Sequence, residues 1–313
     1  MDQRHKQQLA QRFGGRMLRQ RLERQRLRHA EWFRKGRLRF GQRSLNWFCS
    51  LINIFCRMTG IYRLGYRQFH RLRLTEREVP LRRLPPGFDG FRILHLSDLH
   101  LDLDLSFTET LVKTLRDCRY DACVITGDFH NYTVGDHRPA LEELRKVLEV
   151  LPPPVYGVLG NHDSIETVPL LEQLGLRMLL NEHVILRRGA DEICLAGVDD
   201  PNIYQTDRLD RALRGVPPGM AVILLAHSPA IHRQAIKAGV DLLLAGHIHG
   251  GQICLPGGFM VFRNDPSPRQ FWRGAWHAGE TSGYTSRGTG ACGVPLRYFC
   301  PPEAVVHVLR CKG

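Results

Sequence analysis

The sequence predicts an α/β fold, and three observations carry this prediction. The chain of 313 residues is long enough to bury a large core. From Phe91 onward, short apolar runs alternate with stretches of helical periodicity, which is typical of layered domains with much parallel strand pairing. Several of the apolar runs end in Gly, Asp, Asn or His, as strands do where their carboxyl ends form a binding site.

Six strands and five helices are expected between Phe91 and Gly250. The expected strands cover residues 91–97, 121–126, 155–159, 192–198, 221–226 and 241–245. The expected helices lie near residues 107–118, 138–150, 166–175, 206–214 and 230–239. After Gly250 the pattern changes to strands and Gly/Pro turns with little helix, and the last strand is expected near 304–309.

Positive charge is concentrated at the start of the chain. Residues 1–90 carry 22 Lys+Arg against 6 Asp+Glu, a net +16, whereas residues 91–313 carry 22 against 25, a net −3. Residues 1–43 form a basic arm with 14 of these cations. Two interpretations stay open for this arm: a helix or flexible segment that binds phosphate-rich surfaces, or a solvated tail. Anionic lipid is favoured over nucleic acid as its partner, because few aromatic side chains accompany the charges.

Residues 44–79 are expected to be an amphipathic, membrane-interfacial segment. Its apolar side chains recur at helical spacing: Leu45, Phe48, Leu51, Ile52 and Phe55. Two Asn and an Arg interrupt the run, so it is too polar for a membrane span of about 20 residues. We expect residues 1–73 to bind an anionic membrane surface, with a helix packed on the main domain as the alternative.

Residues 80–90 contain Pro85-Pro86-Gly87 and are expected to be a linker into a main domain at 91–313. The nine cysteines form no C-x-x-C pair, which argues against a disulfide framework and indicates a reducing compartment. We therefore expect a cytoplasmic protein that is peripheral on the cytoplasmic membrane.

Five of the apolar runs end in residues that bind metals. They are followed by Asp98-Leu-His100, Gly-Asp128, Asn161-His162-Asp163, His227 and His247-Ile-His249. Each motif alone is weak, because a single histidine or a Gly-Asn-His-Asp turn is common in proteins without a metal. Together, each after its own strand, they predict a metal centre at one edge of the sheet structure.

This order of motifs resembles the calcineurin-like metallophosphoesterase superfamily over residues 91–310. The stretches Gly246-His-Ile-His-Gly-Gly-Gln-Ile, Tyr284-Thr-Ser-Arg-Gly and Leu296-Arg-Tyr-Phe-Cys-Pro-Pro-Glu resemble its bacterial subgroup of small, membrane-associated phosphodiesterases. The resemblance implies an α/β four-layer sandwich, in which two mixed β-sheets are flanked by helices. The basic helical extension would precede this sandwich.

The resemblance also implies a site for two divalent metal ions. Asp98, His100 and His249 would hold one ion, and Asp128 would bridge to the other. Asn161, His227 and His247 would complete the second ligand set. A mixed nitrogen and oxygen donor set suits Mn, Fe or Zn better than Ca. His162 would donate to the phosphoryl or leaving-group oxygen, and Asp163 would orient His162, unless Asp163 instead caps the helix that follows.

The function expected from these residues is hydrolysis of a phosphodiester or pyrophosphate by a metal-activated hydroxide. The amphipathic segment points to a lipid-linked substrate such as UDP-2,3-diacylglucosamine. Two alternatives stay open. One is a nuclease or cyclic-nucleotide phosphodiesterase whose basic arm binds nucleic acid, and the other is a non-catalytic interaction module with the same fold.

Overall fold

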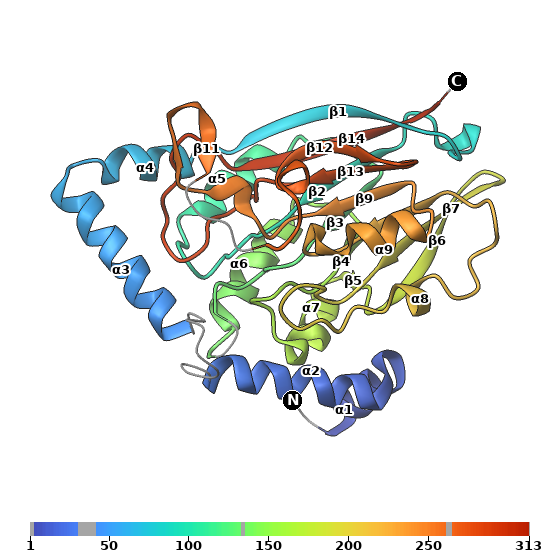
Figure 1. Ribbon diagram of the computed structural model, residues 1–313, viewed down its shortest axis with the longest axis horizontal. Coiled ribbons are helices and arrows are strands. Elements are labelled where there is room, and N and C mark those ends of the chain that lie inside the picture. The colour runs from blue at the N-terminus through green and yellow to red at the C-terminus, as the bar shows by residue number, and fades with distance from the viewer. Residues whose placement is uncertain (1–2, 31–41, 133–134, 261–264, 313) are drawn as a thin grey trace.

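The structure is a computed structural model, and it describes residues 3–30, 42–132, 135–260 and 265–312. Two six-stranded sheets pack face to face (Figure 1). In spatial order, the first sheet consists of β1 (Arg73–Leu81), β14 (Glu303–Cys311), β2 (Arg92–Leu96), β3 (Ala122–Ile125), β4 (Val155–Gly157) and β5 (Leu176–Met178). The second sheet consists of β12 (Gly274–Ala278), β13 (Thr281–Thr285), β9 (Leu242–Ala245), β8 (Val222–Leu225), β7 (Asp191–Gly197) and β6 (Glu182–Arg188).

Both sheets are mixed, as the family resemblance implied. Strands β2 to β5 pair in parallel, while β14 runs antiparallel to β2. In the second sheet β13, β9, β8 and β7 are parallel, with β12 and β6 antiparallel at the two edges. Parallel strands that are buried on both faces have continuous apolar sequences, and these strands could therefore be predicted from the sequence.

Helices cover the outer face of each sheet and complete the four layers. Helices α5 (Phe107–Leu115), α6 (Arg138–Leu148) and α7 (Val168–Gln173) share a buried cluster with the first sheet. Helices α8 (Leu209–Ala212) and α9 (His232–Lys237) share another with the second sheet. The inner faces of the two sheets meet in a third cluster that includes Val124, Leu195 and Leu244. The expected α/β four-layer sandwich is therefore confirmed.

The expected linker at residues 80–90 is wrong. Strand β1 ends only at Leu81 and pairs along its whole length with β14, from Arg73 opposite Glu303 to Leu81 opposite Cys311. Phe88, which follows in the Pro/Gly-rich stretch, is fully buried between the sheets. The domain thus begins with β1. This strand was not predicted, because an edge strand tolerates a proline such as Pro80 and exposes many charged side chains.

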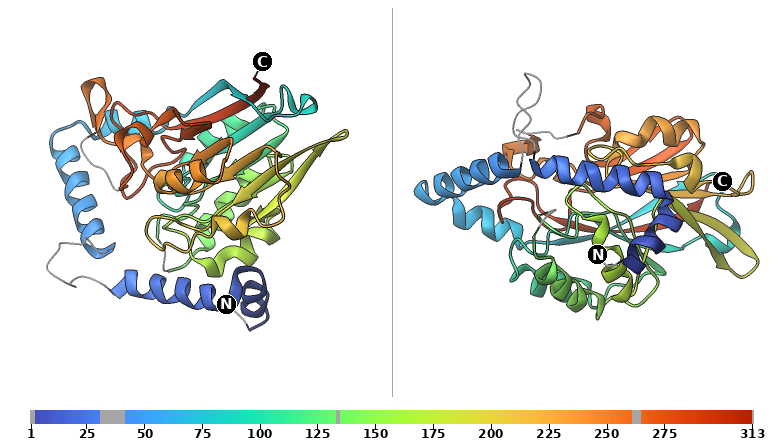
Figure 2. Two further views of the ribbon diagram at one scale, coloured as in Figure 1. Left: turned by 45° about the vertical axis from the view of Figure 1, so that its right-hand side comes forward. Right: turned by 90° about the horizontal axis from the view of Figure 1, so that it is seen from below.

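Residues 3–30 of the basic arm form helices that pack on the domain, so the interpretation as a solvated tail is wrong for these residues. Helix α1 (Gln3–Leu9), a π-helical turn (Ala10–Gly14) and helix α2 (Gly15–Ala30) lie against the main domain (Figures 1 and 2). Their buried side chains are Leu9, Phe13, Leu18, Arg21 and Gln25. Residues 31–41, the rest of the basic arm apart from Gln42 and Arg43, lie outside the described residues. Part of the positive charge therefore serves packing instead of binding an external surface.

The predicted amphipathic segment forms helix α3 (Gln42–Met58), followed by α4 (Tyr62–Phe69). Cys49, Ile52 and Cys56 pack against the segment that contains Leu296 and Tyr298. The opposite side of α3 is exposed to solvent and projects along the outside of the domain (Figure 2). The side chains of Leu45 and Phe48 lie outside the described residues. Within the described ranges, no helix combines the length and apolar character that a membrane span requires.

Candidate metal centre

The predicted metal-binding motifs meet at the carboxyl ends of five strands from both sheets. Asp98 and His100 follow β2, Asp128 follows β3, and Asn161 follows β4. His227 follows β8, and the pair His247 and His249 follows β9. Five of these residues adopt positive φ angles between 43° and 74°: Asp98, His100, Asp128, His247 and His249. Left-handed conformations are sparsely populated by non-glycine residues, and they concentrate at functional sites.

One group of donor atoms is formed by Asp98, His100, Asp128 and His249, all of them buried. The Nε2 atoms of His100 and His249 are 3.2 Å apart. The Nε2 atom of His249 lies 3.3 Å from Asp98 Oδ1, and that of His100 lies 3.6 Å from Asp128 Oδ2. These four side chains therefore aim at a common point.

A second group is formed by Asp128, His227 and His247. His227 Nε2 lies 3.3 Å from Asp128 Oδ2 and 3.2 Å from His247 Nδ1. Asn161 joins this group, because its Oδ1 atom is 3.0 Å from His227 Nε2. Asp128 belongs to both groups through the single oxygen Oδ2, while its Oδ1 accepts a hydrogen bond from the His162 backbone at 2.7 Å.

The donor separations suit divalent ions. Ligand atoms bound at about 2.1 Å to one tetrahedral or octahedral ion lie about 3.0–3.5 Å from one another. Most of the separations above fall in or close to this range. Both carboxylates are also fully buried, which is unfavourable for a negative charge unless a cation accompanies it. The residues therefore fit a metal centre.

Hydrogen bonds to the backbone fix two of the histidine ligands in place. His100 Nδ1 lies 2.9 Å from the His130 carbonyl oxygen, and His227 Nδ1 lies 2.8 Å from that of Thr126. Because a carbonyl oxygen only accepts, each Nδ1 carries a proton and each Nε2 is left to face the donor cluster. Such partners orient metal ligands and raise their basicity.

The electrostatics of the cluster favour bound positive charge. Burial acts to raise the pKa of Asp98, but His249 and His227 outweigh burial and hold that pKa below its usual value. Burial lowers the pKa of His100 well below its usual value. Burial also opposes charge on His227, yet the Asp128 and Asp98 carboxylates raise the pKa of His227 to about 10. The two buried carboxylates thus favour positive charge in the cluster.

His162 lies next to the cluster. Its ring meets that of His100 edge to face, with centroids 5.1 Å apart. Its Nδ1 donates to the Asn131 carbonyl oxygen at 2.6 Å, which leaves Nε2 on the other side of the ring. Nε2 lies 3.7 Å from the sulfur of Cys292.

The expected role of Asp163 is corrected. Its carboxylate accepts hydrogen bonds from the backbone amides of Asp128, Phe129 and Gly160 at 2.7–2.9 Å, instead of holding the His162 ring. Burial and the neighbouring Asp128 carboxylate raise the pKa of Asp163 to about 7. Asp163 therefore ties together the two loops that carry Asp128 and Asn161. The alternative role as a helix cap falls to Ser164, whose hydroxyl accepts from the Glu166 amide.

Two residues near the site were missed by sequence reasoning. Cys292 could add a sulfur donor to His100 and His249, but it lies in a Gly- and Thr-rich loop with no local pattern to reveal it. Arg21 of α2 is fully buried and donates to the carbonyl oxygens of Asp163 and Gly160 at 3.0 and 3.5 Å. Arg21 was missed because it lies in an arginine-rich stretch, and such stretches are usually exposed to solvent.

Comparison with known proteins identifies the family. Residues 91–251 match the family described as calcineurin-like phosphoesterase. The chain belongs to this family. Over 273 residues it is 31% identical to an uncharacterized metallophosphoesterase of Aquifex aeolicus, with 82% of this chain and 98% of that protein covered. It is 30% identical to the uncharacterized metallophosphoesterase YkuE of Bacillus subtilis, with 79% and 89% covered. Both of these relatives are named as metallophosphoesterases.

A longer relative matches over the same domain. The chain is 34% identical to a bovine protein named as a transmembrane protein with metallophosphoesterase domain. The match covers 76% of this chain and 57% of the bovine protein. The chain thus spans a little more than half of this relative.

Proposed function

We propose that this phosphoesterase works with two divalent ions and hydrolyses a phosphodiester or pyrophosphate. The observation that carries the proposal is the position of Asp128 Oδ2, which lies within 3.6 Å of His100 Nε2 on one side and 3.3 Å of His227 Nε2 on the other. An anionic oxygen shared by two donor groups is what a bridging ligand requires. In this proposal, Asp98, His100 and His249 complete one site, and Asn161, His227 and His247 complete the other.

Each part of the site has a separate task. Ions held there would supply Lewis-acid activation of water and of the phosphoryl group. His162 donates a proton from Nε2 to the phosphoryl or leaving-group oxygen, while its Nδ1 is held by the Asn131 carbonyl oxygen. Asp163 acts as a positioning residue, because its bonds to backbone amides fix the loops of Asp128 and Asn161.

The substrate we propose is carried by a membrane lipid, with UDP-2,3-diacylglucosamine as the test compound. The support is an apolar surface on α3 and α4, formed by exposed side chains: Trp47, Leu51, Ile54, Phe55, Met58, Ile61 and Leu64. Neighbouring arginines such as Arg57 and Arg63 would meet anionic headgroups. The bovine relative is named as a transmembrane protein, which agrees with work at a membrane surface.

The nuclease alternative has lost its main support. It relied on a basic arm that binds nucleic acid, and residues 3–30 of that arm pack on the domain. The non-catalytic alternative is disfavoured by the complete set of buried donor atoms.

The decisive assay compares Mn-dependent hydrolysis of UDP-2,3-diacylglucosamine in detergent with hydrolysis of bis(p-nitrophenyl) phosphate. Asp128→Asn is the control, and it should abolish both activities without unfolding the chain. Cleavage of the lipid with high efficiency supports a lipid-linked substrate. Cleavage of the generic diester alone would contradict this substrate while leaving the metal chemistry intact.

Membrane binding requires point variants, because removal of residues 1–73 would also remove the buried Arg21 and disturb β1. We expect Trp47→Ser with Phe55→Ser to lower the sedimentation of the chain with anionic vesicles by more than about tenfold, since two large apolar groups are lost. The matched control is Leu105→Ser with Leu170→Ser, which alters exposed apolar residues outside α3 and α4. Equal losses in both double variants would contradict the proposed surface.

A further inference from the structure

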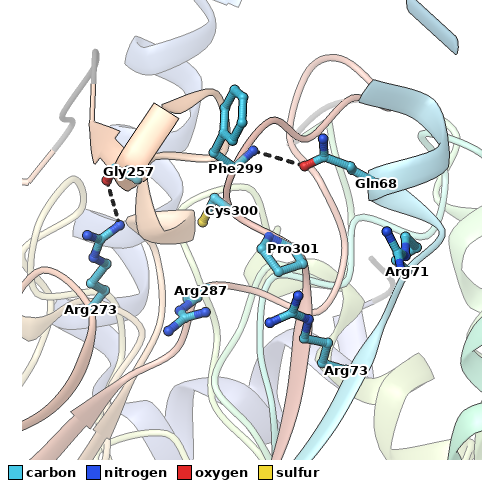
Figure 3. Close-up of a pocket in the computed structure, with 10 residues that line it drawn as sticks. Gln68, Arg71, Arg73, Gly257, Arg273, Arg287, Phe299, Cys300 and Pro301 are labelled. Atoms are coloured by element: carbon cyan, nitrogen blue, oxygen red, sulfur yellow. Dashed lines mark hydrogen bonds between the residues drawn. The ribbon is translucent and has the colours of Figure 1, made fainter. Parts of the chain in front are cut away.

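A cavity of about 500 Å³ lies beside the end of α4 and the hairpin of β10 (Cys254–Leu255) and β11 (Phe259–Met260), and none of the candidate metal ligands lines it. Four arginines line this cavity: Arg71, Arg73, Arg273 and Arg287 (Figure 3). Arg73 begins β1 at the edge of the first sheet, and Arg273 precedes β12 at the edge of the second. In Figure 3, Arg73 and Arg287 lie in the middle of the view, with Arg71 and Arg273 on either side. The fold thus gathers four cations from distant parts of the chain.

The positive charge of this cavity is poorly neutralised. No carboxylate lines it, and within the described ranges no ion pair joins Arg71, Arg73 or Arg273 to an acid. Arg287 Nε is buried without a hydrogen-bond partner, and it lies 3.7 Å from Glu303 Oε2. The other oxygen of Glu303 already accepts from the Tyr284 hydroxyl and from the Arg287 backbone. Because like charges repel when they are brought together, this arrangement favours a bound anion.

The side chains present the geometry that phosphate recognition uses. A guanidinium group is planar and offers paired N–H donors that match two phosphate oxygens. Arginine clusters of this kind bind phosphorylated ligands in many proteins. The cavity is therefore suited to a phosphate group carried on a larger molecule.

The rim of the cavity is apolar and exposed. Phe299 lines the cavity with 47% of its surface exposed, and it adopts a φ angle of 52° that is unusual for a bulky residue. Its backbone amide donates to Gln68 Oε1 at 2.9 Å, which holds it to the end of α4 (Figure 3). Leu255 and Phe259 of the β10–β11 hairpin are 58% and 62% exposed. A cationic pocket bordered by exposed apolar side chains is typical of a surface that meets a lipid bilayer.

The geometry points to a binding site for the phosphate headgroup of an anionic membrane lipid. Arg73 and Arg287 hold the phosphate, while Phe299 and the hairpin enter the boundary of the acyl chains. The inference rests on the membrane-surface part of the proposed function and deepens it. Cys300, in the cavity wall, donates through its thiol to the His249 and Gly250 carbonyl oxygens at 3.4 and 3.3 Å. A bound headgroup would therefore keep the metal centre at a fixed position relative to the membrane surface.

The test uses the full chain with Arg73→Gln and Arg287→Gln together. We expect its partition onto phosphatidylcholine vesicles containing phosphatidylglycerol to fall about thirtyfold, which is the scale for two basic residues at an anionic surface. Vesicles of phosphatidylcholine alone should bind the wild type weakly. Hydrolysis of bis(p-nitrophenyl) phosphate should stay unchanged, because neither arginine belongs to the metal centre.

The matched control is Arg177→Gln with Arg214→Gln, which removes the same charge elsewhere. Arg177 lies on β5, at the opposite edge of the first sheet from β1, and Arg214 follows α8, which contacts β6 at the far edge of the second sheet. Equal loss of vesicle binding in the two double variants would overturn the pocket, since binding would then follow net charge alone. Two results together would overturn the lipid assignment. Inorganic phosphate would raise the Tm of the wild type but not that of the variant without Arg73 and Arg287, and the wild type would not bind the vesicles. Neither result affects the metal chemistry, which Asp128→Asn tests separately.

Discussion

Replacement of Arg21 with methionine should destabilise the protein by about 3–5 kcal/mol, the usual effect of removing one member of a buried ion pair. Arg21 is fully buried, its Nε donates to Asp199 Oδ2 at 3.0 Å, and its guanidinium lies 3.4 Å from the centre of the Tyr204 ring. Burial opposes its charge, but the Asp199 carboxylate outweighs burial and raises the pKa of Arg21. Methionine retains much of the apolar part of the arginine side chain. The decrease in the free energy of unfolding should therefore come mainly from the buried charge of Asp199, which loses its partner.

The measurement is thermal unfolding, in which we expect Tm to fall by about 5–8 °C for a chain of this size. Arg19→Met on the same helix is the control, because Arg19 is exposed and should change stability by less than about 0.5 kcal/mol. Arg21→Met with Asp199→Leu should recover part of the loss, since both charges are then removed. Hydrolysis by Arg21→Met should fall about 10–100-fold, because Arg21 supports the loop of Asn161 and His162. A single variant as stable as the control, or a double variant no better than the single one, would refute this reasoning.

Three further predictions test the fold around the site. Gly246→Ala should lower turnover about a hundredfold, because the added methyl group would collide with Ser97 Oγ beside the metal centre; normal turnover would contradict this close approach. Phe88→Ala should cost about 3–5 kcal/mol in urea unfolding, since Phe88 is fully buried between the sheets, whereas a linker residue would cost almost nothing. Burial lowers the pKa of His95 to about 3 and that of His307 well below its usual value. Below pH 6.5 these histidines therefore bind protons in the unfolded chain but stay neutral in the folded chain. The free energy of unfolding should thus be highest above pH 6.5 and should decrease as the pH falls toward 3. His307→Gln should reduce that slope by about 1.4 kcal/mol per pH unit, and an unchanged slope would disprove the role of His307.

The sequence predicted the parts of the fold whose residues are buried on both faces. The runs before Asp98, Asp128 and His227 became strands within one or two residues of the expected bounds, because continuous Val, Ile and Leu leave few alternatives. Strand β1 was missed, since at an edge position its charged residues are exposed and its Pro80 is tolerated. The docking of α2 was missed for a similar reason, because Arg21 is one arginine among many and only a distant Asp199 makes it structural.

The candidate site was predictable where a short motif places its side chain directly after a strand. Asp98, His100, Asp128, Asn161, His227, His247 and His249 were expected together, and the structure brings their donor atoms into contact. The task of Asp163 was misjudged because hydrogen bonds to backbone amides in another loop leave no mark in the sequence. The arginine cavity was unpredictable for the same reason, since its four cations come from separate segments beside both sheets and meet only in the folded chain.

The most direct test of the central claim is a titration of metal-free protein with Mn²⁺, followed by electron paramagnetic resonance and by hydrolysis of bis(p-nitrophenyl) phosphate. The account predicts two Mn²⁺ ions per chain with a spin-coupled signal, and turnover that appears only with the second ion. In Asp128→Asn the coupling and the turnover should disappear together. Full turnover with a single uncoupled ion, or in the Asp128→Asn variant, would contradict a metal centre bridged by Asp128.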